Sequence, residues 1–124
     1  MKIDLTLMPG DYSICRLEPS SEIPIMQDGF ISVTKTEDEL SVICHVGNEP
    51  SGAKCELNWN LLKVAGPLDF SLVGILAQIS AVLADAGISI FAISTFDTDY
   101  ILVKKENLDC ATQALSEKFL MKTY

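Results

Sequence analysis

Alternating hydrophobic and polar positions predict that the N-terminal part of the chain is built from short β-strands. Ile3, Leu5 and Leu7 alternate with polar neighbours, and the alternation stops at the turn residues Pro9–Gly10. Two later hydrophobic runs flank the acidic segment Thr36–Glu39, which predicts a β-hairpin with an acidic turn. After the first strand, the expected strands cover residues 12–17, 30–35 and 40–46.

The C-terminal part combines strands with the longer periodicity of helices. Residues 59–65 predict a strand buried on both faces, which ends at Gly66–Pro67. Over residues 70–86, hydrophobic side chains recur at the spacing of one helix face, and Gly87 supplies a left-handed stop. The remaining expected elements are a hairpin over residues 88–95 and 100–104, a helix over 108–118 and an edge strand after it.

The order of these elements predicts an α+β fold of the ferredoxin-like type, an antiparallel sheet with two helices on one face. The linker-like residues 47–52 divide the chain, so we expect one unit over 1–52 and a second over 53–124. Thr34–Ile43 lines up with Ser94–Val103 as a hairpin. The halves are therefore interpreted as tandem copies of one unit, the first with a shortened helix.

The charge of the chain argues against nucleic acids and membranes as partners. Its formal net charge is −8, with 17 acidic and 9 basic residues, and such a surface repels phosphate backbones and anionic lipids. The longest hydrophobic stretch, around residues 72–83, is too short and mixed to cross a bilayer. No N-terminal signal-peptide pattern is present. We therefore expect a cytoplasmic protein.

The cysteine and histidine pattern predicts no metal, no cofactor and no catalysis. Cys15, Cys44, Cys55 and Cys110 are widely spaced, and all except Cys55 lie on hydrophobic faces, so buried reduced thiols are expected. His45 would face the opposite side of its strand from Cys44 and could not chelate with it. No glycine-rich phosphate loop is present, and no nucleophile has a histidine at a supporting spacing.

Three segments resemble the ACT-domain family. The run from Trp59 to Leu76, WNLLKVAGPLDFSLVGIL, and the run from Leu83 to Val103, LADAGISIFAISTFDTDYILV, resemble small bacterial ACT-domain proteins, the ACT repeats of eukaryotic cytosolic arginine sensors and, more distantly, the regulatory domains of aspartate kinases. Residues 28–43, DGFISVTKTEDELSVI, resemble the N-terminal unit that precedes this domain in the bacterial proteins. The resemblance implies tandem ACT units with side-by-side sheets, small ligands bound at the junction between units, and a regulatory or sensory role.

The first candidate binding segment joins a strand to the start of the long helix. It consists of Gly66, Pro67, Leu68, Asp69, Phe70 and Ser71. Free backbone N–H groups at such a helix start can receive a carboxylate. Asp69 allows two interpretations, because it can cap the helix or pair with the amino or guanidinium group of a ligand.

The second candidate segment is Ser94, Thr95 and Phe96, at the end of a strand. The side chains of Ser94 and Thr95 are expected to reach the same junction as the first segment. Phe96 either forms a pocket wall together with Phe70 or packs as an ordinary aromatic residue. The neighbouring acidic residues of the hairpin are interpreted as turn chemistry.

The sequence therefore predicts a small-molecule sensor without catalytic activity. An amino acid is the expected effector, and a homodimer is the expected assembly. The alternative is a structural interaction module that has lost its ligand and pairs subunits or partners through exposed sheet edges.

Overall fold

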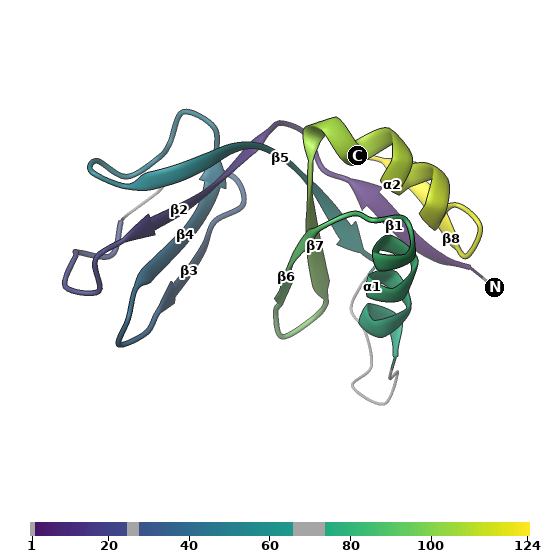
Figure 1. Cartoon of the computed structure of the whole chain (residues 1–124), viewed down its shortest axis with the longest axis horizontal. Coiled ribbons are helices and arrows are strands. Elements are labelled where there is room, and N and C mark those ends of the chain that lie inside the picture. The colour runs from purple at the N-terminus through teal and green to yellow at the C-terminus, as the bar shows by residue number, and fades with distance from the viewer. Residues whose placement is uncertain (1, 25–27, 66–73) are drawn as a thin grey trace. The chain divides into compact units, whose positions relative to one another are not determined.

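The computed structural model describes residues 2–24, 28–65 and 74–124 of the chain (Figure 1). These residues divide into two compact units. The helical unit comprises Met1–Pro9 and Asn60–Tyr124, and the strand unit comprises Gly10–Trp59. The boundary expected between residues 52 and 53 separates two repeats in the sequence. The division into compact units does not test it, so it stays a prediction. In chain order the elements are β1 (Ile3–Leu7), β2 (Tyr12–Leu17), β3 (Ser32–Lys35), β4 (Leu40–His45), β5 (Lys54–Val64), α1 (Ile75–Asp85), β6 (Ile90–Ser94), β7 (Asp99–Lys104), α2 (Leu108–Leu115) and β8 (Phe119–Thr123), with a 3-10 turn over Lys105–Asn107.

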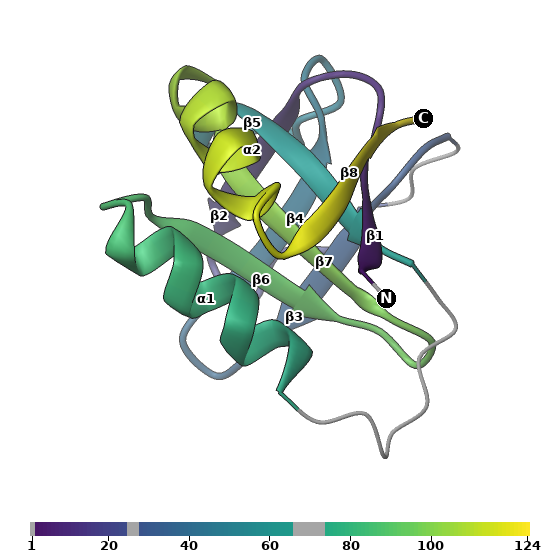
Figure 2. The same ribbon diagram turned by 90° about the vertical axis from the view of Figure 1, so that its right-hand side faces the viewer.

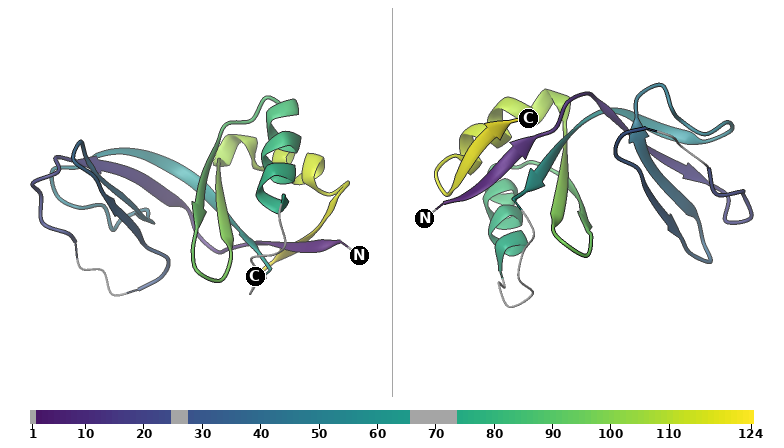
Figure 3. Two further views of the ribbon diagram at one scale, coloured as in Figure 1. Left: turned by 90° about the horizontal axis from the view of Figure 1, so that it is seen from below. Right: turned by 180° about the vertical axis from the view of Figure 1, so that it is seen from behind.

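The sheet of the helical unit runs in the order β8-β1-β5-β7-β6. The strand expected at the C-terminus is present as β8 and forms one edge of this sheet. β1 pairs antiparallel with β5, so that Leu5 lies opposite Val64, and parallel with β8, so that Leu5 lies opposite Met121. Figure 3 shows β1 beside β8 in its right-hand view. The expected α+β fold is confirmed, with a mixed sheet because β1 lies between β5 and β8.

The two helices contact each other and lie over one face of this sheet (Figure 2). On α1, Ile79 and Leu83 are fully buried, as expected for residues four positions apart on one helix face. From the sheet, Leu62 and Val64 point into the same core because alternate residues of a strand share a face. Burial of these side chains holds the helices to the sheet. The buried core consists of Leu5, Leu62, Val64, Ile75, Ile79, Leu83, Ile88, Ile101, Val103, Ala111, Leu115 and Phe119.

α1 ends at the glycine that the sequence indicated. Gly87 adopts φ +73°, and its N–H donates to the carbonyl of Ala84 at 3.0 Å. The N–H of Ile88 donates to the carbonyl of Leu83 at 2.9 Å. This pair of bonds is a Schellman motif, which satisfies carbonyl groups that the end of the helix leaves without partners. The expected helix start over residues 70–73 lies outside the described residues.

The strand unit is an antiparallel sheet in the order β3-β4-β2-β5. A shortened helix was expected before β3, but residues 20–24, the described part of that segment, form none. β5 begins at Lys54, earlier than the expected residue 59, and its polar first half pairs with β2. A register shift interrupts this pairing, and nearby Asn58 adopts φ 67°. Asn tolerates this left-handed conformation better than most residues do.

The hairpin turns of the two units are built alike. Thr36 N donates to Glu39 O at 2.9 Å, and Thr95 N donates to Thr98 O at 2.8 Å. In each turn the threonine hydroxyl also donates to that same carbonyl oxygen. The hydrogen bonds therefore match Thr36 with Thr95, whereas the sequence alignment placed Thr36 opposite Phe96. The correspondence between the hairpins is shifted by one residue, because turn geometry and not side-chain similarity sets the register.

None of the helices in the described part of the chain is long and hydrophobic enough to cross a membrane.

Candidate functional site

The hairpin tip between β6 and β7 carries the second predicted binding segment. Thr95 closes the turn through its backbone, and its hydroxyl donates to Thr98 O at 2.9 Å and accepts from Thr98 N at 3.3 Å. This is the local bonding by which threonine stabilises turns. The Thr95 hydroxyl was expected to face a ligand, and here it holds the turn in shape.

Ser94 also directs its side chain within the hairpin. It lies directly opposite Asp99, and its hydroxyl donates to Asp99 Oδ1 at 2.5 Å. A hydrogen bond to a charged carboxylate is stronger than one between neutral groups. This hydrogen bond fixes the Asp99 carboxylate at the last residue pair before the turn, where a cationic group of a ligand can bind it. Asp97, the other acidic residue of the tip, is exposed.

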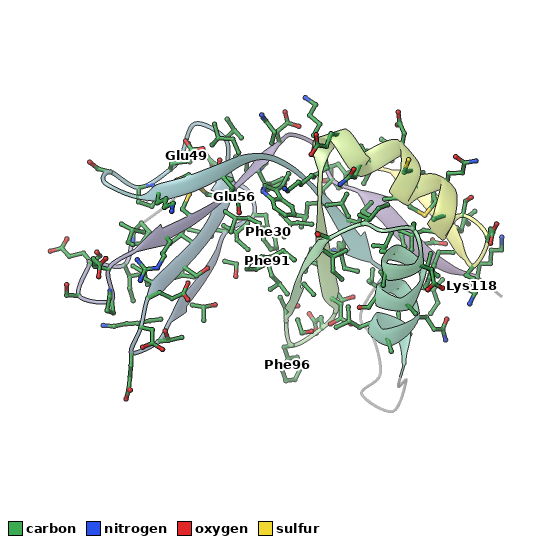
Figure 4. All side chains as sticks on the ribbon, viewed as in Figure 1. Phe30, Glu49, Glu56, Phe91, Phe96 and Lys118 are labelled. Carbon is green, nitrogen blue, oxygen red and sulfur yellow. The ribbon has the colours of Figure 1, made fainter. Side chains whose placement is uncertain are left out.

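Phe96 lies at the outer end of the hairpin, with 82% of its surface exposed. Figure 4 shows its ring at the tip, pointing away from the helical unit. The sequence allowed Phe96 either to form a pocket wall or to pack as an ordinary aromatic residue. Its exposure excludes packing into the core. An exposed aromatic ring next to a carboxylate is suited to contact a ligand or another protein, because it offers a large apolar face at little cost in side-chain entropy.

Thr98 connects the hairpin tip to the strand that leads into the first predicted segment. It is 5% exposed, and its hydroxyl donates to the carbonyl oxygen of Val64 at 2.8 Å. Val64 is the last residue of β5, and the predicted segment Gly66–Ser71 begins two residues later. The hairpin tip is thus held at the end of β5. Residues 66–71 themselves lie outside the described residues.

Sequence reasoning missed the role of Thr98. It stands between two acidic residues, in a stretch with several other hydroxyl groups. No local pattern separates a threonine that bonds its own turn from one that bonds a strand distant in the sequence. Its position immediately before the strand β7 was the only available signal.

The tip of the β6–β7 hairpin offers hydrogen-bond acceptors and an aromatic surface. The described residues contain no group of three metal-ligating side chains that could hold an ion. The oxygen-rich tip suits a ligand that carries amino or guanidinium groups. The backbone N–H groups expected at the start of the long helix suit its carboxylate.

Comparison with known proteins shows which families and structures this chain is similar to. A family model described as the ACT domain matches residues 54–117, and a second model, of an N-terminal domain, matches residues 10–52. The human protein CASTOR3P is 32% identical over 122 residues, covering 93% of this chain and 61% of its own length. The human cytosolic arginine sensor for mTORC1 subunit 1 is 38% identical over 61 residues, covering 48% of this chain and 18% of its own length. The chain therefore spans less than two thirds of the curated relatives that it matches here.

Solved structures agree with these sequence matches. A protein of Agrobacterium tumefaciens superposes with a TM-score of 0.92 at 33% identity, covering 100% of this chain and 95% of that one. The regulatory subunit of aspartate kinase from Thermus thermophilus superposes with a TM-score of 0.63 at 14% identity, covering 89% of this chain and 93% of that one. The second likeness shows the fold alone. The predicted resemblance to arginine sensors and aspartate kinase regulatory domains is confirmed.

Proposed function

This chain belongs to the ACT-domain family, and from that premise we propose that it is a regulatory sensor which binds an amino acid and catalyses no reaction. The observation that carries the proposal is the hydrogen bond from Thr98 to Val64 at 2.8 Å. It holds the tip of the β6–β7 hairpin at the end of the strand that leads into Gly66–Ser71. The proposed site combines that segment with Ser94, Thr95 and Phe96.

The proposed roles follow from the chemistry of each group. The backbone N–H groups of residues 66–71 would bind the carboxylate of the effector. Asp69, if it does not cap the helix, and Asp99 would pair with its cationic groups. The net charge of −8 favours the approach of a cationic molecule over an anionic one. Because a relative is named an arginine sensor, arginine is the first effector to test.

We also propose a cytoplasmic location and a homodimer. The arginine sensors that match this chain are named as cytosolic, and all four cysteines are free thiols, as is usual in a reducing compartment. Among the described residues β6 pairs with β7 alone, so its outer edge can accept a strand from a second copy. Sedimentation velocity over a range of concentrations measures this directly, and a monomer at all concentrations would contradict the dimer.

Calorimetric titration and thermal unfolding with the twenty common amino acids test the sensor function. An effector at about 100 times its dissociation constant stabilises the folded protein by about 2.7 kcal/mol. For a protein of this size the midpoint of thermal unfolding should rise by roughly 5–15 °C. If no amino acid shifts the midpoint or gives a binding isotherm, the proposal is wrong.

A matched pair of variants locates the site. Thr95→Val and Thr36→Val remove the same turn hydroxyl from the two hairpins. Both should cost similar stability, but only Thr95→Val should weaken effector binding, by several-fold. Equal affinities in both variants would place the ligand elsewhere.

A second candidate function is a structural module that docks partners without a ligand. The observation in its favour is that the Ser94 and Thr95 hydroxyls bond within the hairpin while Phe96 is exposed. In that case Phe96→Ser would abolish dimerisation or partner binding and leave thermal stability unchanged. The sensor proposal instead expects Phe96→Ser to weaken effector affinity.

A further inference from the structure

Three cysteines that are distant in the sequence share one face of the strand unit. Cys15 on β2 lies directly opposite Cys55 on β5, and Cys44 on β4 lies opposite Ser13, one position along the same face. No local pattern in the sequence indicates this grouping, because the residues stand on three different strands. The prediction that His45 and Cys44 face opposite sides agrees with this register, since His45 pairs with Tyr12 on the other face.

The Cys15 and Cys55 thiols are in contact. The Cys55 thiol donates a hydrogen bond to Cys15 Sγ, with the two sulfur atoms 2.7 Å apart, and both thiols are free. Directly opposite residues of antiparallel strands have Cα atoms about 4.5–5.5 Å apart. Disulfides span Cα separations of about 4.4–6.8 Å, so the backbone need not move to join this pair.

The surroundings give the two thiols different access to solvent. Cys15 is 2% exposed and packs with Leu40, Val42 and Cys44, whereas Cys55 is half-buried at the border of this cluster. Burial raises the pKa of the Cys15 thiol, and the neighbouring Cys55 thiol raises it further. Cys15 is therefore protonated at neutral pH. A soluble reagent can reach the pair only through Cys55.

We propose that Cys15 and Cys55 form a reversible redox site, which a low-molecular-weight disulfide such as glutathione disulfide oxidises to an intramolecular disulfide. The Cys55 thiolate attacks one sulfur of the reagent, forms a mixed disulfide and releases one thiolate. The Cys15 sulfur then attacks Cys55 Sγ and releases the second thiolate, which takes up the proton of Cys15. Two cysteine thiols are oxidised, and one reagent disulfide is reduced to two thiols. This inference does not rest on the proposed sensor function.

The other two cysteines supply internal controls. Cys44 neighbours Cys15, but it is 1% exposed, and burial raises the pKa of its thiol. Cys110 is exposed, contrary to the expectation of a buried thiol, because the inner face of α2 is formed by Ala111 and Leu115 instead. Cys110 should take up the reagent and remain a mixed disulfide. Cys44 should remain a thiol.

The test is oxidation of the whole chain carrying Cys110→Ser, followed by mass spectrometry of the intact protein and of its peptides. We expect the intact mass to fall by two hydrogen atoms, a cross-linked peptide joining residues 15 and 55, and full reversal by dithiothreitol. The thermal midpoint should rise on oxidation, by roughly 5–15 °C, because the bond closes a long loop. A cross-link between residues 15 and 44, or a stable mixed disulfide at Cys55, would overturn the proposal.

Variants of single cysteines complete the test. Cys44→Ser should still form the cross-link, whereas Cys55→Ser should lose both the cross-link and the rise in midpoint. Since Cys55 is half-buried, the serine should be tolerated, and the midpoint of the reduced variant checks this. If Cys55→Ser does not fold, rates of alkylation of the reduced parent decide instead. Cys55 should react faster than Cys15 and Cys44, and the reverse order would contradict the proposed entry point.

Discussion

The hydroxyl of Thr98 donates to the carbonyl oxygen of Val64 at 2.8 Å, and this bond joins the start of β7 to the end of β5. Thr98 is buried, so its hydroxyl can exchange this partner for water only by local opening. The bond connects residues that are 34 positions apart in the chain. It therefore holds the tip of the β6–β7 hairpin at the end of β5.

Replacing Thr98 by Val should destabilise the protein by about 1–3 kcal/mol, because the side chain keeps its shape while the Val64 carbonyl loses its donor. Denaturation by urea measures the loss. Thr98→Ser retains a hydroxyl and should recover most of the stability. If the Val and Ser variants are equally unstable, the hydrogen bond is not the cause. Under the sensor proposal, Thr98→Val should also weaken effector binding.

Gly29 should resist substitution because the ring of His45 occupies the space beside it. A Cβ at Gly29, where φ is +78°, would collide with Nε2 of His45. That ring is held against Tyr12, with the ring centroids 4.3 Å apart. We expect Gly29→Ala to cost about 2–4 kcal/mol, from backbone strain and overpacking combined.

Gly52 provides the matched control for this prediction. It has φ +80°, but a Cβ there would meet nothing within 4 Å. Gly52→Ala should therefore cost only the strain, about 1 kcal/mol. Chemical denaturation of both variants measures the difference, and His45→Ala combined with Gly29→Ala should reduce it. Equal losses of stability for Gly29→Ala and Gly52→Ala would show that the His45 ring moves aside.

Glu49 should make the stability of the strand unit depend on pH in the acid range. The hydroxyl of Ser13 donates to its carboxylate, and this bond is the main reason that the pKa of Glu49 lies below its usual value. A carboxyl group with a lowered pKa in the folded state stabilises the fold above its unfolded pKa. That contribution is lost as the pH falls through the folded pKa, so acidification below about pH 4.5 should lower stability.

Ser13→Ala tests the assignment. It should lower the stability at pH 7 and flatten the decline of the thermal midpoint between about pH 5 and 3. Glu49→Gln should flatten the same part of the profile. A Ser13→Ala protein with the parent's acid profile would mean that Ser13 does not hold the Glu49 carboxylate.

Asn58 should accept glycine more readily than alanine. Its φ of 67° is a conformation that glycine adopts freely and that a Cβ makes unfavourable. We expect Asn58→Gly to be within about 0.5 kcal/mol of the parent and Asn58→Ala to be about 1 kcal/mol less stable. Urea denaturation of the two variants tests the order. The opposite order would indicate that the conformation at Asn58 does not constrain the strand.

Local patterns of residues are enough to specify several elements of this fold. Ile79 and Leu83 recur at helical spacing, and Gly87 stops that helix, because the periodicity of burial and the conformational freedom of glycine act over a few residues. The alternation of Ile3, Leu5 and Leu7 specified β1 in the same way. The resemblance to the ACT-domain family, carried by the same local segments, was also available at that level.

Contacts between residues that are distant in the sequence became visible in the folded chain alone. The parallel pairing of Leu5 with Met121, the contact of Cys15 with Cys55 and the bond from Thr98 to Val64 each join strands far apart in the chain. Several pairings of a strand satisfy the same alternation of hydrophobic and polar positions. The choice among them depends on the burial and hydrogen bonding of the whole sheet, which no local segment of this sequence contains.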